Sequence, residues 1–147
     1  MAEAAAAGAA LCSGRVVVRR LTASNAGPAD VTEADGYLFA CPENLAAMAG
    51  QMKDFFDRTY YPALDRINGR PYAAMICAGS DGQNAARQIA RIATGWRLRP
   101  VAEPLIVCTR AQTPEAILAP KTISAAELSR CNDLGAALAA GLDLGIF

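Results

Sequence analysis

Residues 34–58 read ADGYLFACPENLAAMAGQMKDFFDR, and this stretch decides the fold. Its first part, residues 37–40 (YLFA), is a short apolar run after Asp35-Gly36, a pattern typical of a buried strand. Pro42 is expected to end this strand, because proline cannot donate a hydrogen bond to a central ladder. The residues around Pro42 therefore form a loop at the carboxyl end of a strand, where open α/β sheets bind ligands.

From Leu45 onward the apolar residues recur with the period of a helix. The predicted inner face holds Leu45, Met48, Ala49, Met52, Phe55 and Phe56. On the outer face, Lys53 with Asp57 and Asp54 with Arg58 have the i,i+4 spacing that lends an exposed helix small support. The whole stretch thus predicts a strand, a loop and a helix.

The bulk composition indicates one globular domain over residues 1–147, with 53% hydrophobic and 19% charged residues. The formal net charge is zero, so nothing electrostatic favours a nucleic acid or an anionic membrane as partner. The apolar runs are too short for a spanning helix, which argues against a membrane protein. Residues 1–4 lack the basic region of a secretory signal, so a cytoplasmic location is expected.

The chain contains no histidine, which excludes Ser-His-Asp and Cys-His catalysis and histidine zinc sites. Its five cysteines are widely spaced and include no CxxC pair. Most of them are expected to be buried as small hydrophobic residues. Cys41 differs because it lies next to the loop. No catalytic side chain and no metal ligand is predicted.

Further elements alternate along the chain, which favours a parallel, doubly wound sheet. Helices are expected over residues 1–11, after residue 84 and from Ser124, where S-x-x-E forms a capping box. Strands are expected at residues 15–21 (RVVVRRL), 71–77 and 101–107, the last at a sheet edge because of Pro104. A glycine-containing loop, residues 78–84, connects the second of these strands to its helix.

Three segments of the chain resemble the flavodoxin-like superfamily, and in particular its FMN-binding NAD(P)H-dependent reductases, including the quinone-reductase type. They are residues 35–42 (DGYLFACP), residues 50–58 (GQMKDFFDR) and residues 79–84 (GSDGQN). The resemblance implies a three-layer α/β sandwich with a parallel sheet, of which four strands are visible in this chain. It also implies bound FMN, NAD(P)H as electron donor, a small-molecule acceptor such as a quinone or a flavin, and a homo-oligomer.

By the same resemblance, the flavin ring lies between two loops. The residues expected to bind it are Pro42, Glu43, Asn44, Leu45 and Met48 on the first loop and Gly79, Ser80, Asp81 and Gly82 on the second. Such loops suit a flavin because proline and glycine turns expose backbone N–H donors, and a helix start adds a positive dipole end. The flavin then carries out the chemistry, so no catalytic side chain is required.

The chain departs from the family pattern at its amino end. The family's first strand and its phosphate-binding Ser/Thr/Gly loop precede the first helix, whereas this sequence opens within or at the start of that helix. Three explanations are open: a shortened start, closure of the two flanking strands onto each other, or a second chain that fills the gap. Two other functions are open as well, an electron-transfer module without a substrate of its own, and a flavin-free domain with a structural role.

Overall fold

The computed structural model describes residues 1–12 and 14–147, with every side chain except that of Cys12, so the expected burial of Cys12 lies outside the described side chains. The elements in chain order are α1 (Ala2–Cys12), α2 (Pro28–Glu33), β1 (Tyr37–Asn44), β2 (Ala47–Met48), α3 (Gly50–Ala63), β3 (Pro71–Ala78), α4 (Gln83–Gly95), β4 (Arg99–Pro100), β5 (Leu105–Cys108), α5 (Pro114–Leu118) and α6 (Ala125–Asp143). None of the helices in this described part combines the length and the apolar character that crossing a bilayer requires.

A parallel sheet forms the middle layer, as the sequence predicts. β3 lies at its centre, with β1 on one side and β5 on the other, and the pairs Phe39↔Ala74 and Ile76↔Ile106 fix the register. β4 pairs with the first residues of β3, while β2 folds back on β1 as an antiparallel hairpin. β3 is buried along its length because its sheet neighbours flank it and helices cover both faces.

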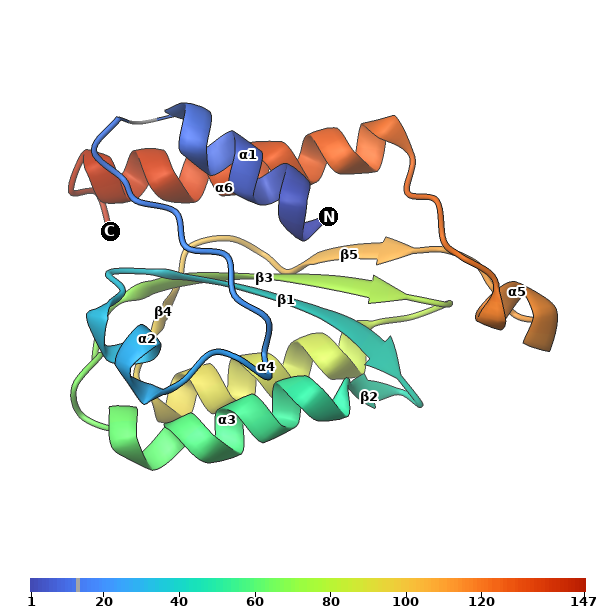
Figure 1. Ribbon diagram of the computed structural model, residues 1–147, viewed down its shortest axis with the longest axis horizontal. Helices are drawn as coiled ribbons and strands as arrows, with labels where there is room; N and C mark the ends of the chain where they lie inside the picture. Colours follow the sequence, from blue (N-terminus) through green and yellow to red (C-terminus); the bar gives the residue numbers. More distant parts are fainter. Residues whose placement is uncertain (13) are drawn as a thin grey trace.

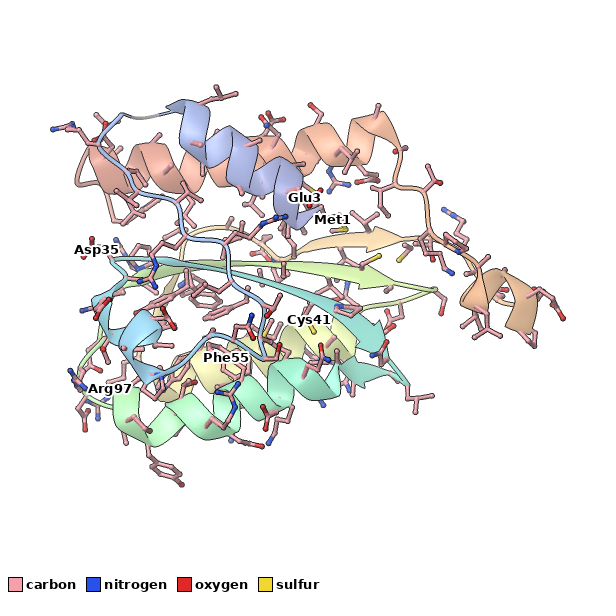
Figure 2. All side chains as sticks on the ribbon, viewed as in Figure 1. Met1, Glu3, Asp35, Cys41, Phe55 and Arg97 are labelled. Atoms are coloured by element: carbon pink, nitrogen blue, oxygen red, sulfur yellow. The ribbon has the colours of Figure 1, made fainter. Side chains whose placement is uncertain are left out.

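Helices cover both faces of the sheet, with α1 and α6 on one side and α3 and α4 on the other (Figure 1). Because side chains alternate along a strand, β3 serves two cores. Ile76 points into the larger core with Phe56 and Trp96, and Phe55 fills the same layer under α3 (Figure 2). Met75 points into the smaller core beside α1 and α6.

Two glycines let α1 and α6 cross at close range. A Cβ at Gly135 of α6 would collide with the carbonyl oxygen of Ala5 in α1, and a Cβ at Gly8 would collide with that of Asn132. Asn132 also donates a side-chain hydrogen bond of 3.2 Å to the Ala4 carbonyl. The first helix therefore belongs firmly to the fold although its own sequence is only weakly amphipathic.

The prediction of a strand over residues 15–21 is wrong. This segment runs outside the sheet from the layer of α1 to the layer of α3 (Figure 1). No described backbone hydrogen bond joins it to β1, and Val17 is 85% exposed. Arg20 pairs with Glu3 at 2.7 Å and Arg19 with Asp30, so side chains rather than a ladder hold the segment. A β-branched run without a neighbouring strand does not form a sheet. The closure of two flanking strands onto each other is thereby contradicted.

The boundaries around Pro42 and Leu45 also differ from the prediction. β1 continues through Pro42, because β3 pairs with only one of its edges there and the missing N–H is tolerated at the free edge. α3 begins at Gly50, not at Leu45, and it extends through Pro62 to Ala63. Met52, Phe55 and Phe56 are buried as expected, whereas Leu45 is fully exposed.

The last predicted strand is shorter than expected, since β5 begins at Leu105 after Pro104. Of the four cysteines whose side chains are described, Cys41 and Cys131 are buried, whereas Cys77 is half-buried and Cys108 exposed, so the expected burial of most cysteines is met by only two of them.

The predicted contacts on α3 and at the start of α6 are present. The ion pairs Lys53–Asp57 and Asp54–Arg58 are present at 2.6 and 2.8 Å, and Ser124 accepts the N–H of Glu127 at the start of α6. Two short helices that the sequence analysis does not predict, α2 and α5, lie between the predicted elements and begin at Pro28 and Pro114. Proline suits the first position of a helix because its missing N–H is not needed there.

Candidate functional site

The two loops singled out from the sequence lie together at the carboxyl ends of β1 and β3. Three side chains join the β1–β2 hairpin to the start of α4. Glu43 Oε2 accepts the N–H of Gly82 at 3.0 Å, Asn84 Nδ2 donates to the Ala46 carbonyl at 2.6 Å, and Gln88 Oε1 accepts the N–H of Met48 at 2.8 Å. We call these three hydrogen bonds the loop clasp. It fixes the relative position of both loops.

The tip of the hairpin is strained. Its two central residues, Leu45 and Ala46, have φ values of +50° and +60°, the left-handed region that turns of this type normally fill with Asn-Gly. Neither residue is a glycine, so the left-handed conformation costs each of them about 1–2 kcal/mol. Leu45 is completely exposed and gains nothing from packing. Strain of this kind concentrates at functional sites, where the surrounding structure maintains it.

Glu43 combines a loop contact with an unused acceptor. Its Oε2 bonds to Gly82, but its Oε1 is buried and has no hydrogen-bond partner among the described residues. Because the carboxylate lies beside the first turn of α4, the dipole of that helix stabilises its negative charge. Neighbouring Asn44 is exposed and closes the hairpin opposite Ala47.

Met48 anchors the hairpin to the core of the protein. Its side chain is only 6% exposed and belongs to the larger core, while its N–H completes the loop clasp. Of the first-loop residues predicted to face a flavin, Pro42, Asn44 and Leu45 are exposed, whereas Met48 lies within the core.

The second loop turns at Gly82, whose φ of +80° is readily adopted only by glycine. A Cβ there would also lie 2.7 Å from the Ile106 side chain. Both the backbone conformation and the lack of space therefore require glycine at position 82. Ser80 and Asp81 are exposed between Gly79 and Gly82. Their position beside the β1–β2 hairpin is the one predicted.

Sequence reasoning missed a third loop and part of the clasp. Thr109 and Arg110, which follow β5, donate backbone hydrogen bonds of 2.8 and 2.7 Å to Ala78 and Gly79. This loop supports the second one from the side of β5. Gln88 was also missed, because its polar side chain one turn inside a helix resembles any solvated residue.

Cys41 is a structural residue of the first loop. Its Sγ accepts the N–H of Ala49 at 3.2 Å and lies 3.1 Å from the Pro42 carbonyl oxygen. Burial raises the pKa of the thiol, and the N–H of Ala49 opposes this only in part. A buried thiol with a raised pKa is a poor nucleophile, so Cys41 shapes the turn after β1.

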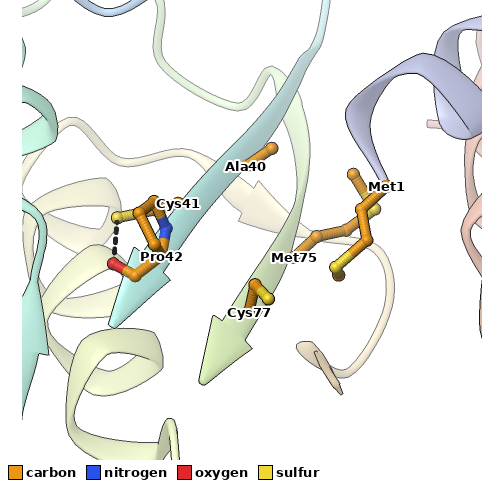
Figure 3. Close-up of a pocket in the computed structure, with 6 residues that line it drawn as sticks. All are labelled: Met1, Ala40, Cys41, Pro42, Met75 and Cys77. Atoms are coloured by element: carbon orange, nitrogen blue, oxygen red, sulfur yellow. Dashed lines mark hydrogen bonds between the residues drawn. The ribbon is translucent and has the colours of Figure 1, made fainter. Parts of the chain in front are cut away.

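A cavity of about 180 Å³ lies on the α1 side of the same strand ends (Figure 3). It is lined by Met1, Ala40, Cys41, Pro42, Met75 and Cys77. None of them is a serine, threonine or glycine, so they do not form the phosphate-binding Ser/Thr/Gly loop that the resemblance implies. The part of the chain described by the structure also contains no cluster of three metal-binding side chains.

The residues present therefore fit the ring of FMN better than its phosphate. The exposed Pro42 and Leu45 offer apolar surface beside the loops, and the exposed Ser80 and Asp81 offer polar groups on the second loop. A flavin ring needs this combination of flat apolar contact and a few placed polar groups.

A wider groove of about 590 Å³ opens on the other side of the hairpin, between α3 and α4. Lys53, Arg87 and Arg91 give it positive charge, and Met48 and Ile92 contribute apolar surface. Lys53 is paired with Asp57, but among the described residues neither arginine forms an ion pair. Arg97, which follows α4, pairs with Asp65 at 2.6 Å.

Comparison with solved structures identifies the fold. The chain is similar to a flavodoxin from the domain Archaea, with a TM-score of 0.74 and 17% identity over 96% of this chain and 87% of that one. It is also similar to a flavodoxin, WrbA-like protein from Agrobacterium tumefaciens (TM-score 0.65, 16% identity, 97% and 87% covered). An NADPH-quinone reductase from P. pentosaceus matches at a TM-score of 0.57 and 12% identity, with 94% and 88% covered.

These likenesses confirm the predicted flavodoxin-like fold. No curated protein sequence matches the chain. The family model described as NADPH-dependent FMN reductase matches residues 23–112, which include both loops, β1, β3, α3 and α4. The predicted resemblance is thus confirmed: the chain belongs to the NADPH-dependent FMN reductase family, a family of flavin-related oxidoreductases.

Proposed function

We propose that this protein is an FMN-dependent oxidoreductase that takes electrons from NAD(P)H and passes them to a small acceptor, a quinone or a free flavin. The observation that carries the proposal is the loop clasp, which fixes two exposed turns beside each other at the carboxyl ends of parallel strands. That is the place where α/β sheets of this kind hold their ligands.

Each loop has its own part in holding the ring. Pro42, Glu43, Asn44 and Leu45 flank it on the hairpin side, with Met48 supporting the hairpin from the core, and Gly79, Ser80, Asp81 and Gly82 flank it on the other. When bound, FMN supplies the electron-transfer chemistry itself. The protein orients the ring and shields one side of it with the apolar surface of Pro42 and Leu45.

The basic groove supports a phosphorylated donor. Arg87 and Arg91 lie one helical turn apart on α4, and both line the groove that begins at the hairpin. Unpaired guanidinium groups bind phosphate through charge-assisted hydrogen bonds. This supports NADPH, with its additional phosphate, as the preferred donor.

We also propose that the protein is a cytoplasmic homo-oligomer with neither nucleic acid nor membrane as partner. The zero formal net charge supports the absence of a polyanionic partner. Tyr61 on α3 is 79% exposed and packs edge-to-face on Tyr60, which supports a contact between copies at this helix.

The test of the function is a titration of the purified protein with FMN, followed by flavin fluorescence, and then an assay of NADPH oxidation with a quinone. Saturable quenching at micromolar FMN followed by turnover is the expected result. Binding without turnover, with reduction only through a partner protein, would establish an electron-transfer module instead.

One observation favours a second candidate, a flavin-free domain with a structural role. The cavity beside α1 is lined by no serine, threonine or glycine that could bind the phosphate of FMN. A folded chain that leaves FMN fluorescence unchanged would establish this candidate and refute the enzyme.

A further inference from the structure

The groove between α3 and α4 is lined as an anion site would be. Arg87 and Arg91 line it and are exposed, and among the described residues neither guanidinium group forms an ion pair. Lys53, although paired with Asp57, adds positive charge from α3, and no carboxylate is among the described residues that line the groove. Guanidinium groups that no carboxylate neutralises are available for charge-assisted hydrogen bonds to an anion.

Gln88 adds a neutral donor between the two arginines. Its Oε1 accepts the N–H of Met48 at 2.8 Å. Because only the oxygen of an amide accepts a hydrogen bond, this contact fixes which way the side-chain amide is turned. Its Nε2 carries two N–H donors, which have no partner among the described residues, and Gln88 lines the groove. Within about one turn, α4 therefore presents two guanidinium groups and an amide donor to the same groove.

A phosphate monoester suits this set of donors. It carries close to two negative charges at neutral pH and three strong acceptor oxygens, so it can accept from all three groups at once. The half-buried Ala47 and Ile92 line the groove as well and offer apolar surface to the organic part of such a ligand. Of the two nicotinamide donors, only NADPH carries a phosphate monoester, on the 2′ position of its ribose.

Gln88 also belongs to the loop clasp, so one side chain contacts both the groove and the hairpin. A phosphate that accepts from its Nε2 holds the side chain in the conformation that binds Met48. It also polarises the amide, which strengthens the hydrogen bond at the opposite oxygen. An occupied groove should therefore hold the hairpin more firmly than an empty one.

On the basis of the function proposed above, we propose that Arg87, Gln88 and Arg91 form a binding site for the 2′-phosphate of NADPH, and that Gln88 transmits its occupation to the hairpin beside the flavin. The donor and the flavin then bind with positive coupling. By linkage, each raises the affinity of the protein for the other.

The site can be tested without FMN. NADP⁺ and NAD⁺ differ only in the 2′-phosphate, and their dissociation constants are measured by isothermal titration calorimetry on the 147-residue chain purified without added FMN. NADP⁺ is expected to bind about tenfold more tightly than NAD⁺, because the phosphate adds charge-assisted hydrogen bonds. Equal affinities would overturn the proposal. Inorganic phosphate that binds alone as tightly as NADP⁺ would show a site for free phosphate and overturn the assignment to NADPH.

Gln88→Glu is the diagnostic variant. Glutamate keeps an oxygen for the N–H of Met48 but replaces the amide donor with a second, negatively charged oxygen that repels phosphate. The preference for NADP⁺ over NAD⁺ should vanish in Gln88→Glu and fall several-fold in Arg91→Gln. It should persist in Arg66→Gln, the matched control, which removes an exposed arginine outside the groove. A preference that survives in Gln88→Glu, or that Arg66→Gln abolishes, contradicts the assigned contacts.

Hydrogen exchange at the Met48 amide tests the coupling. Saturating NADP⁺ should slow this exchange several-fold, whereas saturating NAD⁺ should leave it nearly unchanged. Without a nucleotide, Gln88→Glu should exchange at the wild-type rate, which shows that its hairpin is intact. An amide that exchanges equally fast with and without NADP⁺ would refute the transmission through Gln88.

The two proposals fail in different ways. A wild-type protein that binds FMN and oxidises NADPH, but binds NADP⁺ and NAD⁺ equally well, would refute only this inference. A protein that prefers NADP⁺ but binds no FMN would refute the proposed function, and with it the coupling to the flavin, while the phosphate site would stand.

Discussion

Replacing Leu45-Ala46 by Asn-Gly is expected to stabilise the protein, although it removes an apolar side chain and adds a flexible residue. Both positions are left-handed, with φ of +50° and +60°. The strain there is about 1–2 kcal/mol for each non-glycine residue. Relieving this strain stabilises the folded state, but glycine offsets about 0.5–1 kcal/mol of the stabilisation because it increases the conformational entropy of the unfolded chain. Leu45 is fully exposed, so its removal costs no packing.

The strain of the two residues together is about 2–4 kcal/mol, so the net gain in the free energy of unfolding is about 1–3 kcal/mol for the double variant Leu45→Asn, Ala46→Gly. At about 2–4 °C per kcal/mol for a domain of roughly this size, the melting temperature should rise by about 2–12 °C. Urea unfolding followed by far-ultraviolet circular dichroism measures the free energy. The slope of the unfolding free energy against urea concentration should stay unchanged if only the native turn is affected.

Two residues with ordinary backbone geometry provide the matched control. Leu144 is 68% exposed with φ of −86°, and Ala119 is exposed with φ of −66°. The double variant Leu144→Asn, Ala119→Gly makes the same chemical changes without relieving strain, so it should be neutral or destabilising. If both double variants shift stability alike, the hairpin is not strained and the reasoning is wrong.

Three other predictions concern the helix crossing, the basic groove and the thiols. Gly135→Ala should destabilise the protein by about 1–3 kcal/mol in urea unfolding because its Cβ collides with α1, whereas Gly50→Ala, with open space around it, should not. Arg91→Gln should raise KM for NADPH several-fold and leave KM for NADH nearly unchanged in steady-state assays; equal effects on both donors would contradict a phosphate contact. Burial raises the pKa of the Cys41 thiol above that of a thiol in the unfolded chain, about 8.5, so the folded state favours the neutral thiol. The buried thiol therefore contributes its full stabilisation at pH values below about 8.5, and this stabilisation declines as the pH rises further. Unfolding free energies measured from pH 7 to 10 in wild type and Cys41→Ala should therefore converge at alkaline pH, with the exposed Cys108→Ala as control.

The sequence predicts the elements whose pattern is local. The alternation of strands and helices, the second strand with its glycine loop and the capping box at Ser124 all appear as expected. Both candidate loops were identified in advance because proline and glycine mark turns at strand ends. Their juxtaposition follows from the parallel sheet, which gathers the carboxyl ends of β1 and β3 at one edge.

The errors arise where the outcome depends on neighbours rather than on the local pattern. Residues 15–21 have every local property of a strand but no strand beside them, and side-chain spacing does not reveal that. Leu45 fits a helical face by period, yet the chain makes a hairpin before α3 because β2 pairs with β1. The loop clasp could not be predicted from the sequence either, since Glu43 and Gly82 are brought together only by the tertiary fold.

The single tryptophan makes only one half of this molecule visible to optical spectroscopy. Trp96 is fully buried between Tyr60, stacked at 5.7 Å, and Phe56, edge-on at 5.5 Å, in the layer of α3 and α4. The buried cluster beneath α1 and α6 contains no aromatic residue but does contain the fully buried Cys131. Tryptophan emission therefore reports the melting of one layer, and the reaction of a thiol reagent with Cys131 reports the opening of the other. Used together on one sample, they would show whether the two sides of the sheet unfold in a single step.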